Sequence, residues 1–567
     1  MEKFKSIIES ETFIDVMIII ALMIVLTITS GFFAFSFLPD RGREFLFSEA
    51  VLNGLVPYKD ITMIYFPLSY YINAFVFRLF GVSFNSLIIF AACFCTFFMI
   101  IYYLTAKEFL NRKIAIILSV FVILSCVFCL HDSNLYTSPY AFSRVYGIIG
   151  GVSCLFFLLK LFDTDNIKYG YLAALSASFS VSNRIEFVPV IVVLFLGFIL
   201  YKRLKITEYI KLLLISMLFP FLTILFLVVG GVTYSDILSA IDFFIKFSST
   251  QTMKTYLATC GVTPSFPAEY IIKGLPPLII TTLLCLLYCF LDKKYKNKII
   301  LPLMLIIAIP VCYFMRNTAY YWIELPLLTI LFAIVFFKDI IKDKKMLLLL
   351  IAVMIFSQRS LFQLDLLKQG VYAFPLLIIL SLTIIKDYIS RYIPKIPVEK
   401  FIIFFFIVLI GAYSIQQAVR IKYVRYPLKT DKGTLYMTPG LVKIYGNTIK
   451  YIENNIPENV KLIVLPEGLM FNFITDRKTD MNCFIMDAPY YFAYGEKKAL
   501  ELIKNANFDY IIIADGFTLV LYGFDSLYAP NASIIADYIF QNYTKVYQEA
   551  EDNNPKNIIT IYKKNDN

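Results

Sequence analysis

Residues 16–38 read VMIIIALMIVLTITSGFFAFSFL, an uninterrupted apolar run near the start of the chain. About 20 apolar residues are enough for a helix to cross the roughly 30 Å of hydrocarbon in a bilayer. The run is too long for the hydrophobic core of a signal peptide, and no small-residue cleavage site follows it. We therefore predict a retained membrane helix here.

The composition places the whole chain in the same class. Of its 567 residues, 59% are hydrophobic and only 16% are charged, and the mean hydropathy is +0.73. These values lie well outside those of soluble globular domains and exclude a soluble enzyme. The formal charge of +11 sits mainly on Lys and Arg in short loops between apolar runs, where basic residues orient membrane proteins rather than bind nucleic acid.

The basic loops decide the topology around one doubtful segment, residues 64–80. If this segment crosses the membrane, three basic loops fall outside; if it lies in the interface, five basic loops all fall in the cytoplasm. Arg78, near the end of the segment, also suits an interfacial helix. We therefore predict about 13 transmembrane helices, near residues 13–37, 85–105, 114–130, 144–162, 169–183, 186–201, 210–230, 271–291, 299–315, 319–337, 346–358, 371–385 and 401–418.

This threading predicts a cytoplasmic N-terminus and an extracytoplasmic C-terminus. Residues 1–419 form the membrane region, with two long outer loops at 38–84 and 231–270. From residue 420 the hydropathy falls, and helix and strand patterns predict a small extracytoplasmic α/β domain over 420–567. Few cysteines lie outside the apolar runs and no eukaryotic-style targeting signal is present, so a bacterial plasma (inner) membrane is expected.

The first outer loop contains the most informative polar residues. Asp40 follows the first apolar run directly, at the membrane boundary, where a carboxylate could meet a lipid-linked substrate and an aqueous acceptor together. It is our candidate general base. Its position also fits a simple N-cap of an interfacial helix beginning near Arg41, which an Asp performs well. Position alone leaves both interpretations open.

Further along this loop the chain reads Gly54-Leu-Val-Pro57-Tyr58-Lys-Asp60, then Pro67-Leu68-Ser-Tyr70-Tyr71, and ends at Phe80-Gly81. The loop resembles the first outer loop of the GT-C polyprenol-phosphate-sugar-dependent glycosyltransferases, the group that includes protein O-mannosyltransferases and lipid A aminoarabinose transferases. The resemblance covers the first third of the chain, and it implies a GT-C-like fold with an interfacial helix after the first span.

The resemblance also implies site residues. It assigns Asp40 as the catalytic acid after the first helix and makes Tyr58, Asp60 and Pro67 the loop motif. Many members carry two adjacent acids where this chain has Asp40-Arg41, so Glu44 is the candidate for the second acid. A paired proline of many members is also replaced here, by Phe66-Pro67.

The second outer loop contains Asp132 beside the only histidine, His131. In the resembling group an acid here often lines the same cavity or binds a divalent cation, so Asp132 is a third catalytic candidate and a divalent cation is a candidate cofactor. One His and one Asp are a poor ligand set, however. A solvated loop acid explains the pair equally well, so the metal requirement stays open.

Arg184 and Glu186 lie between apolar stretches at an outer helix junction. Ionisable groups at such depth usually face a partner or a cavity, and a guanidinium can bind a lipid phosphate through two donors. The pair could equally snorkel and bind each other. Arg316 and Tyr320 form a further donor-binding candidate, although they also fit an interfacial belt. In the C-terminal domain, residues 466–468 and 474–477 are interpreted as acceptor-handling segments.

Together these features favour a membrane glycosyltransferase in cell-envelope glycan biosynthesis. It would move a sugar from a polyprenyl-phosphate carrier to a glycan, glycolipid or protein acceptor outside the cytoplasm, with Asp40 as base and Arg184 on the phosphate. No nucleotide-binding motif is evident. A transporter or flippase of lipid-linked sugars, or a polysaccharide polymerase or ligase, remains an alternative, although no internal repeat and no large late outer loop is evident.

Overall fold

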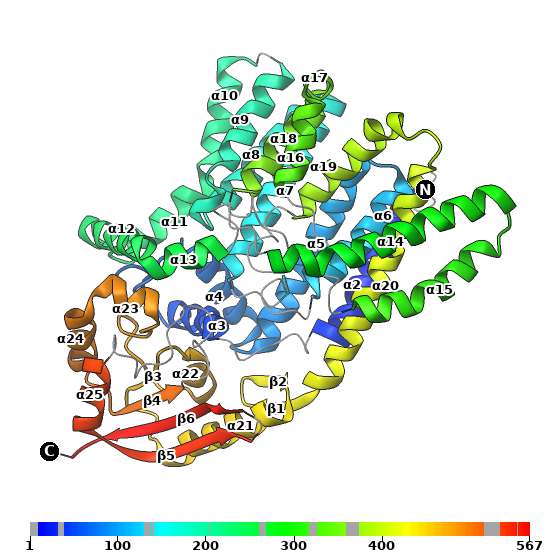
Figure 1. The fold of residues 1–567 in the computed structure, drawn as a ribbon. Coiled ribbons are helices and arrows are strands. Elements are labelled where there is room, and N and C mark those ends of the chain that lie inside the picture. Colours follow the sequence, from blue (N-terminus) through cyan, green and yellow to red (C-terminus); the bar gives the residue numbers. More distant parts are fainter. Residues whose placement is uncertain are drawn as a thin grey trace.

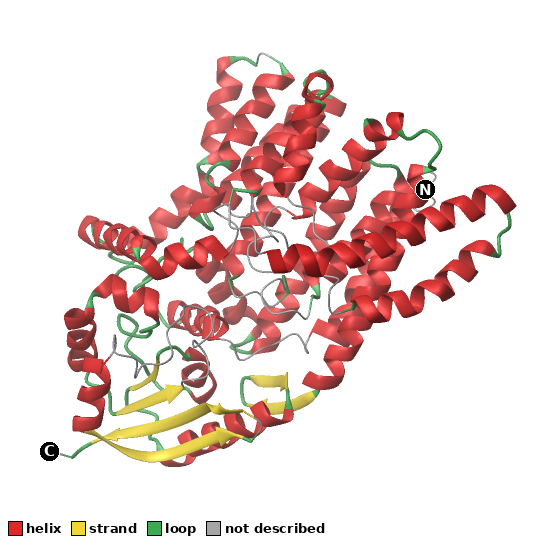
Figure 2. Cartoon of the chain, viewed as in Figure 1, coloured by secondary structure: helices red, strands yellow, loops and turns green. Residues whose placement is uncertain are grey.

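A bundle of helices with a small group of strands at one end makes up the computed structural model (Figures 1 and 2). All strands in the described ranges lie after residue 425. The polytopic helical class expected from hydropathy is confirmed. The structure describes residues 10–31, 39–129, 136–137, 141–202, 204–259, 268–316, 326–358, 374–514, 533–552 and 554–566.

The described part of each apolar run predicted as a span falls on one helix or on consecutive helices, because a helix satisfies its backbone polar groups without water. Within the described ranges, five helices are long and apolar enough to cross a bilayer, and a sixth if the pair α10–α11, bent by 44°, is one span. The count of thirteen crossings therefore stays a prediction. The helices before residue 426 are α2 (Glu11–Leu26) with the π-helical η1 (Thr27–Gly31), α3 (Pro39–Leu52), α4 (Leu68–Phe80), α5 (Phe84–Lys107), α6 (Arg112–Val122) with the π-helical η2 (Ile123–Val127), α7 (Phe142–Thr164), α8 (Ile167–Val181), the 3-10 turn η3 (Ile185–Phe187), α9 (Val190–Tyr201), α10 (Ile206–Ser216), α11 (Leu218–Val229), α12 (Tyr234–Ser249), α13 (Gln251–Thr259), α14 (Ala268–Tyr295), α15 (Ile300–Met315), α16 (Pro326–Val335), α17 (Phe337–Ile340), α18 (Lys344–Phe356), α19 (Phe374–Asp387), η6 (Ile389–Tyr392) and α20 (Val398–Val424).

The loops rich in Lys and Arg lie at the end of the bundle away from the strands (Figure 1). Lys345, at the start of α18, forms ion pairs with Glu108 and Asp163, and Lys160 reaches Glu108 at 2.6 Å. Further ion pairs at this end join Arg112 to Asp15, Lys202 to Asp165 and Lys400 to Asp292. The basic loops therefore share one end of the bundle and are cross-linked there, as a common side of the membrane requires.

At the opposite end, α3 and α4 pack against each other next to the strands (Figure 1). The 13 residues of α4 rise only about 20 Å, too little to cross the hydrocarbon region. Helix α4 begins after Pro67 and ends at Gly81, which has a φ of +84° that a glycine adopts without strain. The length of α4 fits the interfacial helix expected over residues 64–80.

The C-terminal region, residues 426–566, contains a four-stranded sheet in the order β3-β4-β6-β5. Strand β3 is parallel to β4, and the remaining pairs are antiparallel. β3 and β4 are apolar and buried throughout, as strands covered on both faces are. The elements are the hairpin β1 (Tyr426–Thr430) and β2 (Gly433–Met437), then α21 (Pro439–Asn455), β3 (Leu462–Leu465), α22 (Leu469–Thr475), α23 (Ala488–Tyr494), α24 (Glu496–Ala506), β4 (Tyr510–Ala514), α25 (Ser533–Asn542), β5 (Tyr543–Glu551) and β6 (Asn554–Lys564).

The C-terminal region shares a core with the first outer loop. The ring of Phe473 lies 5.3 Å from that of Phe45 in α3 and 5.4 Å from that of Phe84 in α5, measured between centroids. At the edge of this core Lys432 bridges Glu49 at 3.0 Å and Asp476 at 2.7 Å. Helix α3 is thus held between the membrane helices and the C-terminal region.

The closest approach in this interface is at Gly42. A Cβ atom built there would lie 2.3 Å from the backbone nitrogen of Met470 in α22, a distance that only backbone movement could relieve. The glycine therefore lets α3 and α22 touch backbone to backbone.

We expect Gly42→Ala to destabilise the protein by about 1–3 kcal/mol, the usual cost of forcing atoms into a packed interface. The check is the thermal midpoint of the detergent-purified protein, with protease release of the C-terminal region as a second readout. Gly446→Ala in α21 is the control, because its Cβ would meet only the end of the Leu428 side chain at 3.3 Å. Equal midpoints for both variants would contradict the tight contact.

Candidate functional site

A group of buried charged side chains lies where α3 begins. Helix α3 begins at Pro39, so Asp40 is its second residue and lies inside the first turn. The alternative interpretation, in which Asp40 is the N-cap of a helix that begins near Arg41, is therefore wrong. The side chain of Asp40 is outside what the structure describes. The next residues, Arg41, Arg43 and Glu44, are all buried. Burying so many charges at one point is costly, and such sites usually serve function.

Glu44 is enclosed by donors from two other helices. Its Oε1 accepts a hydrogen bond from the Tyr70 hydroxyl of α4 at 2.9 Å, and its Oε2 accepts one from the Phe142 backbone N–H at the start of α7, also at 2.9 Å. The Arg43 Nε lies 4.0 Å from the Glu44 Oε1, and the Glu44 side chain is 1% exposed. Burial and the nearby Glu44 charge raise the pKa of Tyr70, so its hydroxyl stays a donor. This geometry suits a carboxylate that positions three helices.

The loop motif holds the backbone between α3 and α4. The Asp60 carboxylate accepts from the Val56 N–H at 2.8 Å, and Tyr58 adopts a φ of +68°, which turns the chain sharply. The Tyr58 hydroxyl then donates to the Tyr65 carbonyl oxygen at 2.8 Å. Pro67 is the residue before the first turn of α4. Tyr58, Asp60 and Pro67 therefore shape the loop and set the position of Tyr65.

Tyr65 lies between two arginines from distant parts of the chain. The guanidinium carbon of Arg43 is 5.1 Å from the Tyr65 ring centroid, and that of Arg184 is 4.6 Å from it, both within cation–π range. Arg184 also pairs with Glu186 at 3.1 Å. The helix junction at residue 184 and the first outer loop thus meet at one ring.

Several buried charges were not among the residues predicted from the sequence. Arg43 sits in a polar stretch with no apolar flanks, whereas Arg144, 0% exposed at the start of α7, has the same apolar surroundings that drew attention to Arg184. From the C-terminal region, Glu467 and Asp487 are buried, and Asp487 caps α23 by accepting from the Tyr490 N–H at 3.1 Å. Glu467 lies in a segment expected to handle the acceptor.

The remaining candidates are placed elsewhere or not described. Arg316 follows the last residue of α15, donates to the Tyr313 carbonyl at 2.5 Å and covers the Tyr313 ring with its guanidinium carbon 4.0 Å from the ring centroid. Tyr320 and Asp132 lie outside the described residues. In the part of the chain that is described, no three His, Cys, Asp or Glu residues form a metal-binding group, and the side chains of Asp40 and Asp132 are not in that part.

No family model and no curated protein matches the sequence. Among solved structures, the apo oligosaccharyltransferase of Archaeoglobus fulgidus matches with a TM-score of 0.50 at 12% identity, over 98% of this chain and 75% of that one. Apo ArnT from Cupriavidus metallidurans matches with a TM-score of 0.50 at 9% identity, over 96% and 97% of the two chains. The chain has the GT-C fold. The match covers nearly all of this chain and nearly all of ArnT, so the GT-C fold implied by the resemblance of the first outer loop is confirmed.

We expect Glu44→Ala to destabilise this GT-C chain strongly, because two buried donors lose a charged acceptor and each such bond contributes about 1.5–3 kcal/mol. The thermal midpoint in detergent measures the effect. Glu208→Ala is the matched control, since Glu208 also accepts from a tyrosine hydroxyl, that of Tyr171 at 2.5 Å, but in a more exposed position. If Glu44→Ala left the midpoint at the value of the Glu208 variant, Glu44 would not be holding the helices.

Proposed function

We propose that this chain is a glycosyltransferase that moves a sugar from a polyprenyl-phosphate carrier to an acceptor at the extracytoplasmic face of a bacterial plasma membrane. One observation supports it above the others: Arg43 and Arg184 share the Tyr65 ring at the end of a bundle of apolar helices, close to the start of α3. ArnT from Cupriavidus metallidurans, which shares the GT-C fold, has also been solved with undecaprenyl phosphate, in a structure that matches with a TM-score of 0.45.

The arginines at Tyr65 support a ligand that carries a phosphate. Arg43 and Arg184 are buried, Arg43 lies 4.0 Å from Glu44, and Arg184 pairs with Glu186 at 3.1 Å, so both guanidinium groups are held in place. A phosphate diester supplies a negative charge and oxygens that accept two parallel N–H bonds from a guanidinium. A polyprenyl tail attached to that phosphate would lie in the surrounding bilayer.

The roles follow from the chemistry of transfer to an acceptor hydroxyl. Asp40 removes the hydroxyl proton as the acceptor oxygen attacks C1 of the sugar, and the C1–O bond to the phosphate breaks with inversion. Arg184 and Arg43 stabilise the charge on the departing polyprenyl phosphate. Glu44 keeps α3, α4 and α7 in register, so it acts through the positions of other groups.

The orientation belongs to the same proposal. With the cross-linked basic loops in the cytoplasm, the N-terminus is cytoplasmic, and the arginines and the C-terminal region face outward. The membrane region over 1–419 would bind the donor, and residues 420–567 would form an extracytoplasmic domain. A donor carried by a lipid and an acceptor arriving from water would then meet at the membrane surface.

We expect Asp40→Asn to lower transfer at least about a hundredfold, because general bases contribute roughly 10² to 10⁴ in rate. Mass spectrometry of envelope glycans from cells with each variant measures transfer. Asn has nearly the size of Asp and changes only the charge in the first turn, where an acid contributes about 0.3–1 kcal/mol to helix stability, so a structural role for Asp40 predicts near-normal transfer by this variant. That outcome would move the base assignment to Glu44 or Asp132, and normal transfer by single variants at all three positions would refute the mechanism.

We expect Arg184→Ala to weaken binding of undecaprenyl phosphate to the purified protein by about ten- to a hundredfold, because a charge-assisted contact to phosphate is lost. Arg184→Lys keeps the charge but not the planar fork, so it should lose less. Arg391→Ala is the control: Arg391 also covers a tyrosine ring, that of Tyr388 at 5.2 Å, but among the basic loops. Equal affinity of all four proteins would remove Arg184 from the site.

A further inference from the structure

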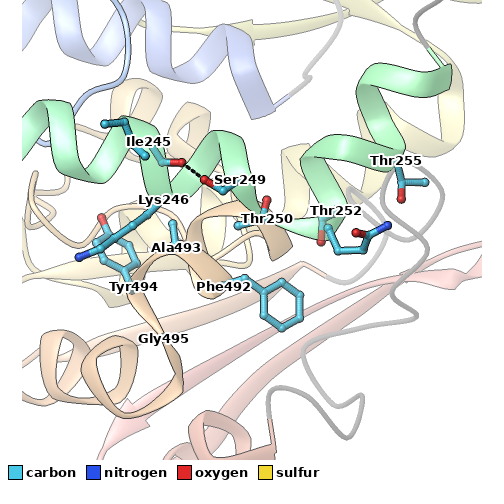
Figure 3. A pocket seen from close by; sticks show the side chains of 11 residues that line it. Ile245, Lys246, Ser249, Thr250, Thr252, Thr255, Phe492, Ala493, Tyr494 and Gly495 are labelled. Atoms are coloured by element: carbon cyan, nitrogen blue, oxygen red, sulfur yellow. Dashed lines mark hydrogen bonds between the residues drawn. The ribbon is translucent and has the colours of Figure 1, made fainter. Parts of the chain in front are cut away.

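A cleft of about 790 Å³ lies between the helix pair α12–α13 and the corner where α23 turns into α24 (Figure 3). It is of the size of small-molecule sites in proteins. None of the residues predicted from sequence as catalytic or donor-binding lines it. Both walls come from segments outside the spanning helices, one in the second long outer loop and one in the C-terminal region.

One wall is rich in hydroxyl and amide groups. Ser249, Thr250, Gln251, Thr252 and Thr255 line it within a single helical junction. The Thr250 hydroxyl donates to the Phe247 carbonyl at 2.9 Å and accepts from the Met253 N–H at 3.2 Å, which holds the junction between the two helices. The Ser249 hydroxyl likewise donates to the Ile245 carbonyl. The side chains of Gln251, Thr252 and Thr255 can each donate and accept, so they match ligands whose groups also do both.

The facing wall presents an aromatic ring. Phe492 is 40% exposed, and Figure 3 shows its ring projecting into the cleft opposite Thr250 and Thr252. An aromatic face is electron-rich, so it attracts C–H groups that carry partial positive charge. The face of a sugar ring presents such C–H groups, while its edge carries hydroxyls. A cleft with one aromatic wall and one hydroxyl and amide wall therefore matches the two surfaces of a saccharide.

One aromatic residue next to the cleft segment, Tyr490, is also influenced by Arg43. Tyr490 of α23 packs on Phe247 of α12 with 5.1 Å between centroids. Burial raises the pKa of Tyr490, and the positive charge of Arg43 acts in the opposite direction, which places Arg43 close to this ring. Tyr490 therefore packs against α12, whose C-terminal end borders the cleft, and is also influenced by Arg43.

The same helix also reaches the lipid boundary. On α12, Leu238, Ile241 and Ile245 are exposed at helical spacing and form an apolar stripe, while Phe243 and Phe247 face α23. An exposed apolar stripe beside a polar face is typical of a helix lying in the membrane interface. Ile245 borders the cleft, so the cleft opens where lipid and water meet.

We propose that this cleft binds the saccharide portion of the acceptor, which makes the acceptor a carbohydrate rather than a peptide. The proposal rests on the glycosyltransferase function above and specifies the substrate class of the second substrate. Both walls are helical among the described residues, so they offer no strand edge to which a peptide backbone could add.

Binding of a panel of soluble envelope-type oligosaccharides to the detergent-purified full-length protein tests the idea without requiring transfer. Saturation-transfer NMR reports binding, and Ser/Thr-containing peptides form the competing panel. We expect at least one oligosaccharide to bind, Phe492→Ala to weaken it about tenfold or more, and Phe492→Tyr to restore it. Thr255→Val, which removes only a hydroxyl, should weaken it severalfold. Phe540→Ala, at a ring 49% exposed on α25, is the matched control and should bind as the parent does.

The outcomes separate this inference from the proposed function. Oligosaccharide binding that is unchanged by Phe492→Ala and Thr255→Val, binding of peptides alone, or binding of neither panel would overturn the saccharide cleft, whatever the transfer assay shows. Loss of saccharide binding in a Phe492→Ala protein whose thermal midpoint matches the parent would support it. Normal transfer by Asp40→Asn, Glu44→Gln and Asp132→Asn variants would refute the catalytic mechanism, and the cleft would then still stand as a saccharide site.

Discussion

One buried carboxylate, that of Glu44, holds together the helix ends on which the candidate site is built. It accepts from Tyr70 of α4 and from the Phe142 N–H of α7 while belonging to α3 itself. A buried charge is tolerated only when donors surround it, and here the positive end of the α7 dipole adds to the hydrogen bonds. The direction in which α3 leaves the membrane, and with it the position of Asp40 and Arg43, depends on this contact.

The first outer loop extends the arrangement from α3 to the helix junction at Arg184. Its motif residues act on the backbone: Asp60 closes the turn and Tyr58 holds the Tyr65 carbonyl. Tyr65 can then offer its ring to Arg43 and Arg184 together. The ring thus brings two guanidinium groups to one position, each with a carboxylate nearby, Glu44 for Arg43 and Glu186 for Arg184. This arrangement fits the proposed binding of a phosphate.

Hydropathy predicted the spanning helices well where each forms one continuous run. Helix α5 covers 84–107 against the expected 85–105, and α7 covers 142–164 against 144–162. The span expected near 186–201 begins with the 3-10 turn η3 and becomes α-helical at Val190, directly after Pro189, which lacks a backbone N–H. Local hydropathy does not contain such turn geometry.

The site was predictable only in part, for a related reason. Arg184 was visible in sequence because apolar residues flank it, and Asp40 because the first apolar run ends beside it. Arg43 was not, since its ring partner Tyr65 comes from the next loop and its electrostatic neighbour Tyr490 from the C-terminal region, and no local pattern encodes proximity across more than 400 residues. The hydroxyl and aromatic walls of the cleft likewise meet only after folding.

The packing of the C-terminal region links it mechanically to α3. Phe473 packs on Phe45 of α3, and Gly42 meets the α22 backbone directly, so α3 cannot shift without the C-terminal region. Tyr490 belongs to that same region and contacts both α12 and the surroundings of Arg43. Closely packed interiors resist gradual deformation. Movement of α12 against α23 would therefore displace Tyr490 and change the surroundings of Arg43, with no flexible segment needed between α12 and Arg43.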